Sequence, residues 1–145
     1  MRVIAGKAAP TPENLAQSRT ALTRLAATSP QFQVRVLTEN WFDLLSTPEA
    51  VHELMQGLNV GLNFDFGNWS SADKYAQLAE IAPLAEGSHA KAHFENEQID
   101  VADFERCLRI LRDAHFSSPY SLVCDNAADR WRALGQMRAI VEGCL

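Results

Sequence analysis

The chain has 145 residues, of which 47% are hydrophobic and 21% charged, as is typical of a single globular domain. Its net charge of −5 and the lack of a basic cluster argue against a protein that binds nucleic acid through its phosphates. No apolar stretch approaches the roughly 20 residues of a membrane span, and no signal-peptide segment opens the chain, so we expect a cytoplasmic protein without a membrane partner.

The first half of the chain is predicted to form two strand–helix pairs. A short β-type run at 2–6 comes before a helix near 13–28, whose apolar residues recur with helical spacing. A second apolar run ends at Glu39. Thr47 and Pro48 then supply an N-cap and a first-turn proline for the second helix.

The second half is predicted to contain three more strand–helix pairs. The strands are expected at 60–64, 88–92 and 121–123. The helices that follow them are expected to begin at Ser70 or Ser71, at Asp100 and at about Ala127. Trp131 is expected on the buried face of the last helix, together with Leu134 and Val141.

Strands that alternate with helices are typical of parallel α/β sheets. A closed parallel barrel needs eight βα units and typically about 250 residues. Five units over residues 1–145 therefore predict one α/β domain. It is either an open five-stranded sheet or the major part of a barrel whose first units are absent.

Four of the apolar runs end on a side chain that can bind a metal ion. These side chains are Glu39, Asp65, His89 and Asp125. Parallel strands joined by helices all end at the same rim, so the four can converge there. Carboxylates together with an imidazole suit Mn²⁺, Mg²⁺ or Zn²⁺. The pattern predicts a divalent-metal site at this rim.

Each of these residues also allows a purely structural interpretation. Glu39 could cap the next loop or pair with a basic residue, and Asp65 could form an Asx-turn before Gly67. Asp125 could cap the turn into the last helix, and His89 could be a histidine with a structural role only. The sequence leaves these alternatives open.

Further residues near the predicted rim are candidates for substrate contact. Alternation along a strand places Lys91 and His93 on the same face as His89, where they could contact a substrate oxygen or phosphate. Trp41 and Trp69 each lie close after a candidate ligand. They could stack on a sugar face or simply cover the mouth of a barrel.

Four motifs, in this order and at these spacings, resemble the xylose isomerase-like TIM-barrel superfamily, and most of all its sugar phosphate isomerase/epimerase group. The motifs are Thr38-Glu39-Asn40-Trp41, Phe64-Asp65-Phe66-Gly67-Asn68-Trp69, His89-Ala90-Lys91-Ala92-His93 and Pro119-Tyr120-Ser121-Leu122-Val123-Cys124-Asp125. The resemblance covers nearly the whole chain. It implies a single partial (β/α) barrel domain over 1–145, in which 2–6 matches the fourth barrel strand and 121–125 the eighth.

The resemblance also implies roles for individual residues. Glu39, Asp65, His89 and Asp125 would hold the metal, and the first and last of them would take and return the substrate proton. Asp125 is shorter by one methylene than the glutamate of better-known relatives, so Glu39 is the first choice for the base and Asp125 the second. Asn68 stands where many relatives carry histidine. It is a poor metal ligand, and we place it with the substrate-binding residues.

The activity implied is isomerisation or epimerisation of a sugar, sugar phosphate or sugar-like polyol by proton transfer beside a carbonyl. The alternatives are a non-catalytic remnant or binding module, a keto-inositol dehydratase and a DNA-repair endonuclease. The last is disfavoured because the chain is acidic and poor in histidine. An unclosed barrel has exposed strand edges, so we also expect self-association or association with a missing N-terminal barrel half.

Overall fold

A computed structural model describes residues 1–144 and shows an α/β fold built on a four-stranded parallel sheet. The strands, in their order across the sheet, are β1 (Leu37–Glu39), β2 (Gly61–Asp65), β3 (Ala85–Lys91) and β6 (Tyr120–Val123). The main helices are α1 (Pro12–Thr28), α2 (Pro48–Met55), α3 (Lys74–Ile81), α4 (Val101–Asp113) and α5 (Arg130–Cys144). Alternation of parallel strands and helices confirms the predicted α/β class.

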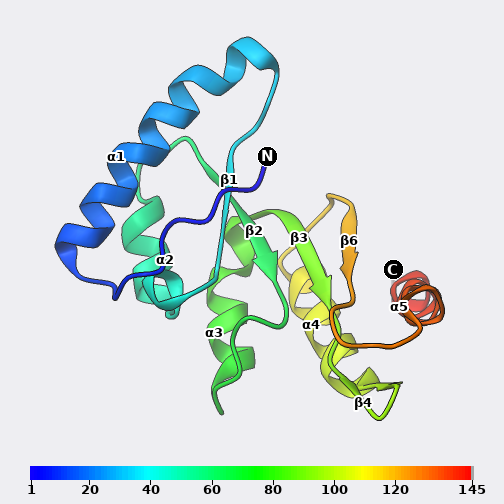
Figure 1. The fold of residues 1–145 in the computed structure, drawn as a ribbon. Coiled ribbons are helices and arrows are strands. Elements are labelled where there is room, and N and C mark those ends of the chain that lie inside the picture. The colour runs from blue at the N-terminus through cyan, green and yellow to red at the C-terminus, as the bar shows by residue number, and fades with distance from the viewer. Residues whose placement is uncertain (145) are drawn as a thin grey trace.

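The helices form one curved row. Each helix from α1 to α5 packs against the next one along the chain. Figure 1 shows α3 and α4 beside the central strands, with α1 and α5 at the two ends of the row. A row of helices outside a parallel sheet is also the arrangement found in the wall of a (β/α) barrel. None of the helices formed by residues 1–144 has the length and apolar character that crossing a membrane requires.

The predicted first strand is reduced to a single parallel bridge between Arg2 and Leu37. The amide of Val3 donates to the carbonyl of Leu37 at 2.8 Å, but the pairing stops there. The segment then leads toward α1, where the Ser18 hydroxyl donates to the carbonyl of Ala5 at 2.8 Å. The segment therefore packs against α1 instead of continuing as a strand paired with β1.

The two faces of the sheet differ in chemistry. Phe64, Leu62 and Ala90 are fully buried on the helix-facing side, where Phe66 packs against Phe104 of α4 with ring centroids 5.8 Å apart. The opposite face carries polar side chains. They lie on one face because residues that are paired in register on parallel strands project to the same side of the sheet. The pairs there are Glu39 with Asn63, Asp65 with His89, and Lys91 with Val123.

The helix starts agree with the prediction in part. The Thr47 side chain caps α2 and the Asp100 side chain caps α4, as expected. Helix α3 begins at Lys74 rather than after Ser70 or Ser71, since the amide of Lys74 donates to the Ser71 carbonyl in a preceding turn.

The prediction for the last helix was wrong in two respects. Helix α5 begins at Arg130, where the Asp129 carboxylate accepts from the amide of Arg132 at 3.0 Å. Trp131 is 86% exposed rather than buried. The buried stripe of α5 is Ala133, Met137 and Val141, spaced four residues apart, and Trp131 lies outside that stripe.

A small hairpin was not predicted. It consists of β4 (Phe94–Glu95) and β5 (Gln98–Ile99), paired antiparallel between β3 and α4. Its two turn residues, Asn96 and Glu97, both have positive φ angles. Such a turn usually carries glycine, and this one does not, so the sequence offers no strong hairpin signal.

Candidate metal site and adjoining pocket

Three of the four predicted ligands meet at the carboxyl end of the sheet. Glu39 ends β1, Asp65 ends β2, and His89 is paired in register with Asp65 on β3. One ligand atom from each of these residues lies within 4.8 Å of the other two. Glu39 and Asp65 are each only 2% exposed. We call these three residues the triad.

Glu39 has a partner for each carboxylate oxygen. Oε2 accepts a hydrogen bond from the Arg2 guanidinium. Oε1 accepts from the side-chain amide of Asn68 at 3.1 Å and lies 3.2 Å from Nδ1 of His89. Glu39 therefore does form the ion pair with a basic residue that the sequence left open. Asn68, expected to contact substrate, donates its amide to Glu39.

Asp65 is held by backbone groups. Its Oδ1 accepts from the amide of Gly67 at 2.7 Å, which is the Asx-type contact anticipated from the sequence. Its Oδ2 lies 3.6 Å from Nδ1 of His89. Asn40 fixes the strand end, because its side chain bonds to both the amide (2.8 Å) and the carbonyl (3.1 Å) of Asp65. The turn and the ligand role are thus compatible.

Burial and charge shift the pKa values of the triad in different directions. Burial alone would raise the pKa of Glu39, but the hydrogen bonds with His89 and Arg2 lower it to about 2. The Asp65 and Glu39 carboxylates raise the pKa of His89 to about 9. Burial raises the pKa of Asp65 above its ordinary value, against the opposing effect of His89. Without a bound cation, protonated His89 and Arg2 together balance the two acids.

The donor set of the triad fits a divalent cation. Two carboxylates and one imidazole are ligands that Mn²⁺ and Zn²⁺ accept, and three protein ligands leave positions open for other molecules. Two carboxylates buried this deeply are costly unless a positive group compensates them. Without a cation, protonated His89 and Arg2 supply that charge, and a cation among the triad would replace the proton of His89 in this role.

Asp125 lies outside the triad, in contrast to its predicted place among the ligands. Strand β6 ends at Val123, which is in register with Lys91, so Asp125 lies beyond the strand end. Its carboxylate is 61% exposed and forms an ion pair with Nζ of Lys91 at 2.7 Å. The expected convergence therefore holds for β1, β2 and β3 and stops at β6.

A cavity of about 590 Å³, here called the rim pocket, adjoins the triad. Trp69, Lys91, His93 and Asp125 line it, together with Lys74, Tyr75 and Asp103 at the starts of α3 and α4. Lys91 connects the pocket to the triad, since it follows His89 by two residues on the same face of β3. The Lys91 side chain passes over Gly67, where a Cβ would lie 3.0 Å from its Cδ.

The polar groups of the rim pocket are largely paired. Nζ of Lys74 and the hydroxyl of Tyr75 both bond to Oδ1 of Asp103, at 2.6 and 2.8 Å. That contact raises the pKa of Tyr75 to about 12, so Tyr75 keeps its proton near neutral pH. The indole N–H of Trp69 donates to the Leu45 carbonyl at 3.0 Å. The pocket wall is therefore pre-organised.

His93 and Trp41 differ from their predicted settings. Strand β3 ends at Lys91, so His93 is an exposed residue after the strand and its carbonyl accepts from the amide of Asp100. Trp41 does not line the rim pocket. It stacks on Phe42 with centroids 4.3 Å apart, and the Arg2 guanidinium lies 5.3 Å from its ring centroid.

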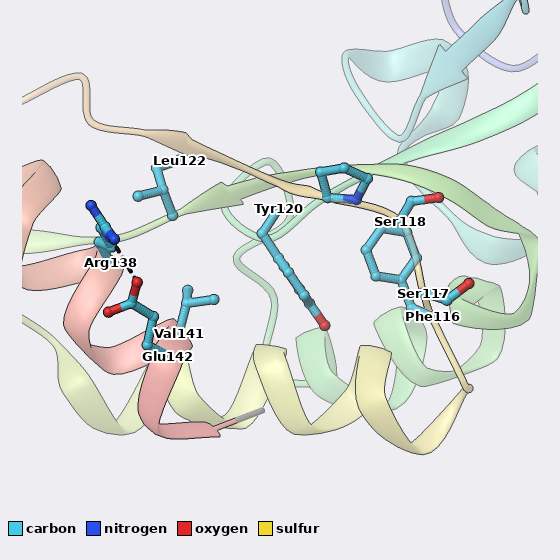
Figure 2. Close-up of a pocket in the computed structure, with 9 residues that line it drawn as sticks. Phe116, Ser117, Ser118, Tyr120, Leu122, Arg138, Val141 and Glu142 are labelled. Carbon is cyan, nitrogen blue, oxygen red and sulfur yellow. Dashed lines mark hydrogen bonds and ion pairs between the residues drawn. The ribbon is translucent and has the colours of Figure 1, made fainter.

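Another cavity, of about 550 Å³, lies between β6 and α5. Figure 2 shows Tyr120 and Leu122 of β6 on one side and Val141 of α5 on the other. The charged groups at this cavity, Arg138 and Glu142, are paired with each other along the helix at 2.8 Å. The lining is mainly apolar and brings no acid–base or ligand cluster together.

Sequence comparisons find neither a matching family model nor a matching curated protein. Among solved structures, the chain is similar to the crystal structure of a D-tagatose 3-epimerase-like protein, with a TM-score of 0.66 and 19% sequence identity. The match covers 98% of this chain and 62% of that chain. This likeness confirms the predicted fold: the chain has an α/β architecture that corresponds to part of a TIM barrel.

Proposed function

We propose that the chain carries the metal site of an isomerase or epimerase that moves a proton beside the carbonyl of a sugar or sugar-like polyol. The observation that carries the proposal is the triad of Glu39, Asp65 and His89 at the carboxyl ends of adjacent parallel strands. TIM-barrel enzymes place their active sites at this end of the barrel. The epimerase-like name of the similar solved structure supports the same class.

Glu39, Asp65 and His89 would hold a divalent cation such as Mn²⁺, Mg²⁺ or Zn²⁺. When bound, the cation supplies a Lewis acid that polarises a substrate carbonyl and the hydroxyl beside it. The chain contributes the geometry of the ligands. Asn40 fixes Asp65, while Asn68 and Arg2 fix Glu39, so the ligand atoms are oriented before a cation arrives.

Asp125 is the stronger candidate for the residue that moves the substrate proton. Glu39 is fully engaged by three partners, and a pKa of about 2 makes it a poor base. Asp125 is open to solvent, lines the rim pocket and has Lys91 as its ion-pair partner. We therefore assign Glu39 to metal binding and Asp125 to proton transfer, with Lys91 orienting its carboxylate.

We place the substrate in the rim pocket. Trp69 contributes an aromatic wall, and Lys91 and His93 offer donors to hydroxyl, carbonyl or phosphate oxygens. Asn68 and Trp41 have other partners, so the proposal gives them supporting roles around Glu39 and Arg2. A sugar and a sugar phosphate both suit this lining.

Proton exchange with solvent tests the proposed reaction even when the product is unidentified. The chain, loaded with Mn²⁺ or Mg²⁺, is incubated in D₂O with a panel of ketoses, aldoses and their phosphates. NMR then follows deuterium uptake at the carbon next to the carbonyl. The proposal expects uptake that requires the metal and disappears in Asp125→Asn. Metal binding without uptake for any sugar would contradict it.

A second candidate is a binding module or barrel remnant without turnover. The observation that favours it is that the chain spans 62% of the length of the structure it matches. In the described part of the chain, β6 has a neighbouring strand on one side only. We propose that the chain associates with itself or with a partner that supplies the opposite wall. Light scattering tests this, and a compact monomer would contradict it.

A further inference from the structure

Arg2 is a residue of the site that the sequence pattern did not indicate. Its parallel bridge to Leu37 places it beside β1, with its side chain on the same face as Leu37 and Glu39. The side chain extends along β1 to reach Oε2 of Glu39, and its guanidinium lies over the ring of Trp41. The bridge and the aromatic ring together fix the guanidinium against the triad.

The two oxygens of Glu39 have different partners. Oε1 faces His89 and also accepts from Asn68, so this oxygen is turned toward the other ligands of the triad. Oε2 is held by Arg2. Removal of Arg2 would therefore free one oxygen of Glu39 and leave the other in place, because Asn68 and the strand still position it.

The positive charge of Arg2 beside the triad opposes the binding of a metal cation there. Arg2 brings a permanent positive charge to a carboxylate that is 2% exposed; its own side chain is 36% exposed, so solvent screens this charge in part but does not separate it from Glu39. Two other basic side chains lie on this face: the charge of Lys91 is offset by Asp125, and His89 would bind the ion as a neutral imidazole. A divalent ion among the triad would therefore share the charge of Glu39 with Arg2 and meet the repulsion of its guanidinium.

We propose that Arg2 is an internal counter-ion that shares Glu39 with the metal and weakens the site's affinity for divalent cations. This inference rests on the proposed metal site. Removing the charge of Arg2 is expected to tighten metal binding, because the loss of repulsion outweighs the loss of one hydrogen bond to an oxygen that does not face the triad. A residue that merely held Glu39 in place would have the opposite effect, since loss of such outer partners weakens metal sites by about 10–100-fold.

The test is a titration of Mn²⁺, and separately of Co²⁺, into Arg2→Gln, Arg2→Met and Arg2→Lys at one pH and ionic strength. Any affinity tag is placed at the C-terminus so that the residues around Arg2 are unchanged. Arg2→Met keeps an aliphatic stem against Trp41, which provides a second charge-free variant in case Arg2→Gln is poorly folded. Circular dichroism verifies the fold of each protein.

Arg35→Gln is the matched control. Arg35 also forms an ion pair, with Glu86 at 2.6 Å, and its removal changes the net charge of the chain by the same amount. Both residues of that pair are about 43% exposed. The control therefore separates a local effect at the triad from a general effect of net charge on cation attraction.

We expect the dissociation constant to fall at least tenfold in Arg2→Gln and Arg2→Met. It should stay within about threefold of wild type in Arg2→Lys and Arg35→Gln. Equal or weaker binding in the charge-free variants would overturn the role of Arg2 while leaving the metal site intact. Failure of wild type and all Arg2 variants to bind, or undiminished binding in Asp65→Asn/His89→Ala, would instead overturn the metal site itself.

Discussion

The carboxyl ends of β1–β3 and the carboxyl end of β6 share a sequence pattern, but the acids near these ends differ in burial and in their number of partners. In both, an apolar run ends near an acid. Glu39 becomes 2% exposed with three polar partners, whereas Asp125 stays 61% exposed with Lys91 as its ion-pair partner. The difference is position in the sheet. The Glu39 carboxylate lies between the N-terminal segment and β2, while β6 is the last strand of the described sheet.

This comparison shows what a strand-ending acid needs in order to become part of a site. Its place along the strand sets which rim it reaches, but the strands on either side provide the partners that bury and orient it. Arg2 comes from one neighbour of β1, and Asn68 and His89 come from the other side. Asp125 has no such second neighbour within residues 1–144, so its carboxylate stays open to solvent, where it can serve in proton transfer.

The largest expected difference between the two rims is in stability. Glu39→Gln would remove the counter-charge that Arg2 and protonated His89 share and leave Asp65 with His89 alone; breaking a buried ion pair costs up to about 3–5 kcal/mol, and the partial exposure of Arg2 lowers that cost. Asp125→Asn removes a surface partner and should change the free energy of unfolding by less than about 1 kcal/mol. Urea denaturation of both variants measures the difference. Equal losses would contradict the contrast between the rims.

The pH dependence of stability gives a second contrast. The pKa of His89 is about 9 in the folded chain and 6.5 in the unfolded chain. The contribution of His89 to the free energy of unfolding is therefore complete below pH 6.5 and is lost as the pH rises through 9. The pKa of Glu39 is lowered to about 2, so its contribution is present above about pH 4.5 and is lost as the pH falls toward 2.

Urea midpoints of the metal-free chain between pH 6 and 9.5 test the His89 contribution. Stability should decline over this range in wild type, and the decline should be smaller in His89→Gln. His52→Gln is a suitable control, because His52 is an exposed histidine that lies 3.6 Å from Glu80. The same slope in wild type and His89→Gln would show that the triad does not hold His89 protonated.

The smallest effect is expected at the β6 side of the molecule. Trp131→Ala should alter the free energy of unfolding by no more than about 0.5 kcal/mol, because the side chain is 86% exposed. Trp69→Ala, at the other rim, removes a buried ring and the hydrogen bond to Leu45, and should cost about 3–5 kcal/mol. A large loss in Trp131→Ala would indicate that this ring is covered in solution, as association of the chain would require.

The sequence predicted the parts of the fold and site that depend on periodicity and on strand ends. The α/β order and the convergence of Glu39, Asp65 and His89 follow from that pattern alone. The exposure of Asp125 and the reduced first strand could not be predicted, because both depend on which strands lie beside which. Arg2 was expected only as part of a strand, since no local signal reveals a contact with a residue 37 positions away.

Other differences have equally specific causes. Asn40 looks like an ordinary residue after a strand. Its role emerges only when β2 lies beside it, because its side chain then donates to the carbonyl of Asp65 and accepts from the amide of Asp65. The β4–β5 hairpin turns through Asn96 and Glu97, so the usual glycine signal is absent. Trp131 is apolar, but its spacing from Ala133, Met137 and Val141 directs it away from the sheet.

The most direct test of the metal site is the thermal stability of the chain with and without Mn²⁺. A ligand at a hundredfold excess over its dissociation constant stabilises the native state by about 2.7 kcal/mol. We predict that Mn²⁺ raises the melting temperature of wild type and of His52→Ala/Asp73→Asn, a control pair at exposed positions, but not that of Asp65→Asn/His89→Ala. Equal increases in all three proteins would place the metal elsewhere and contradict the account.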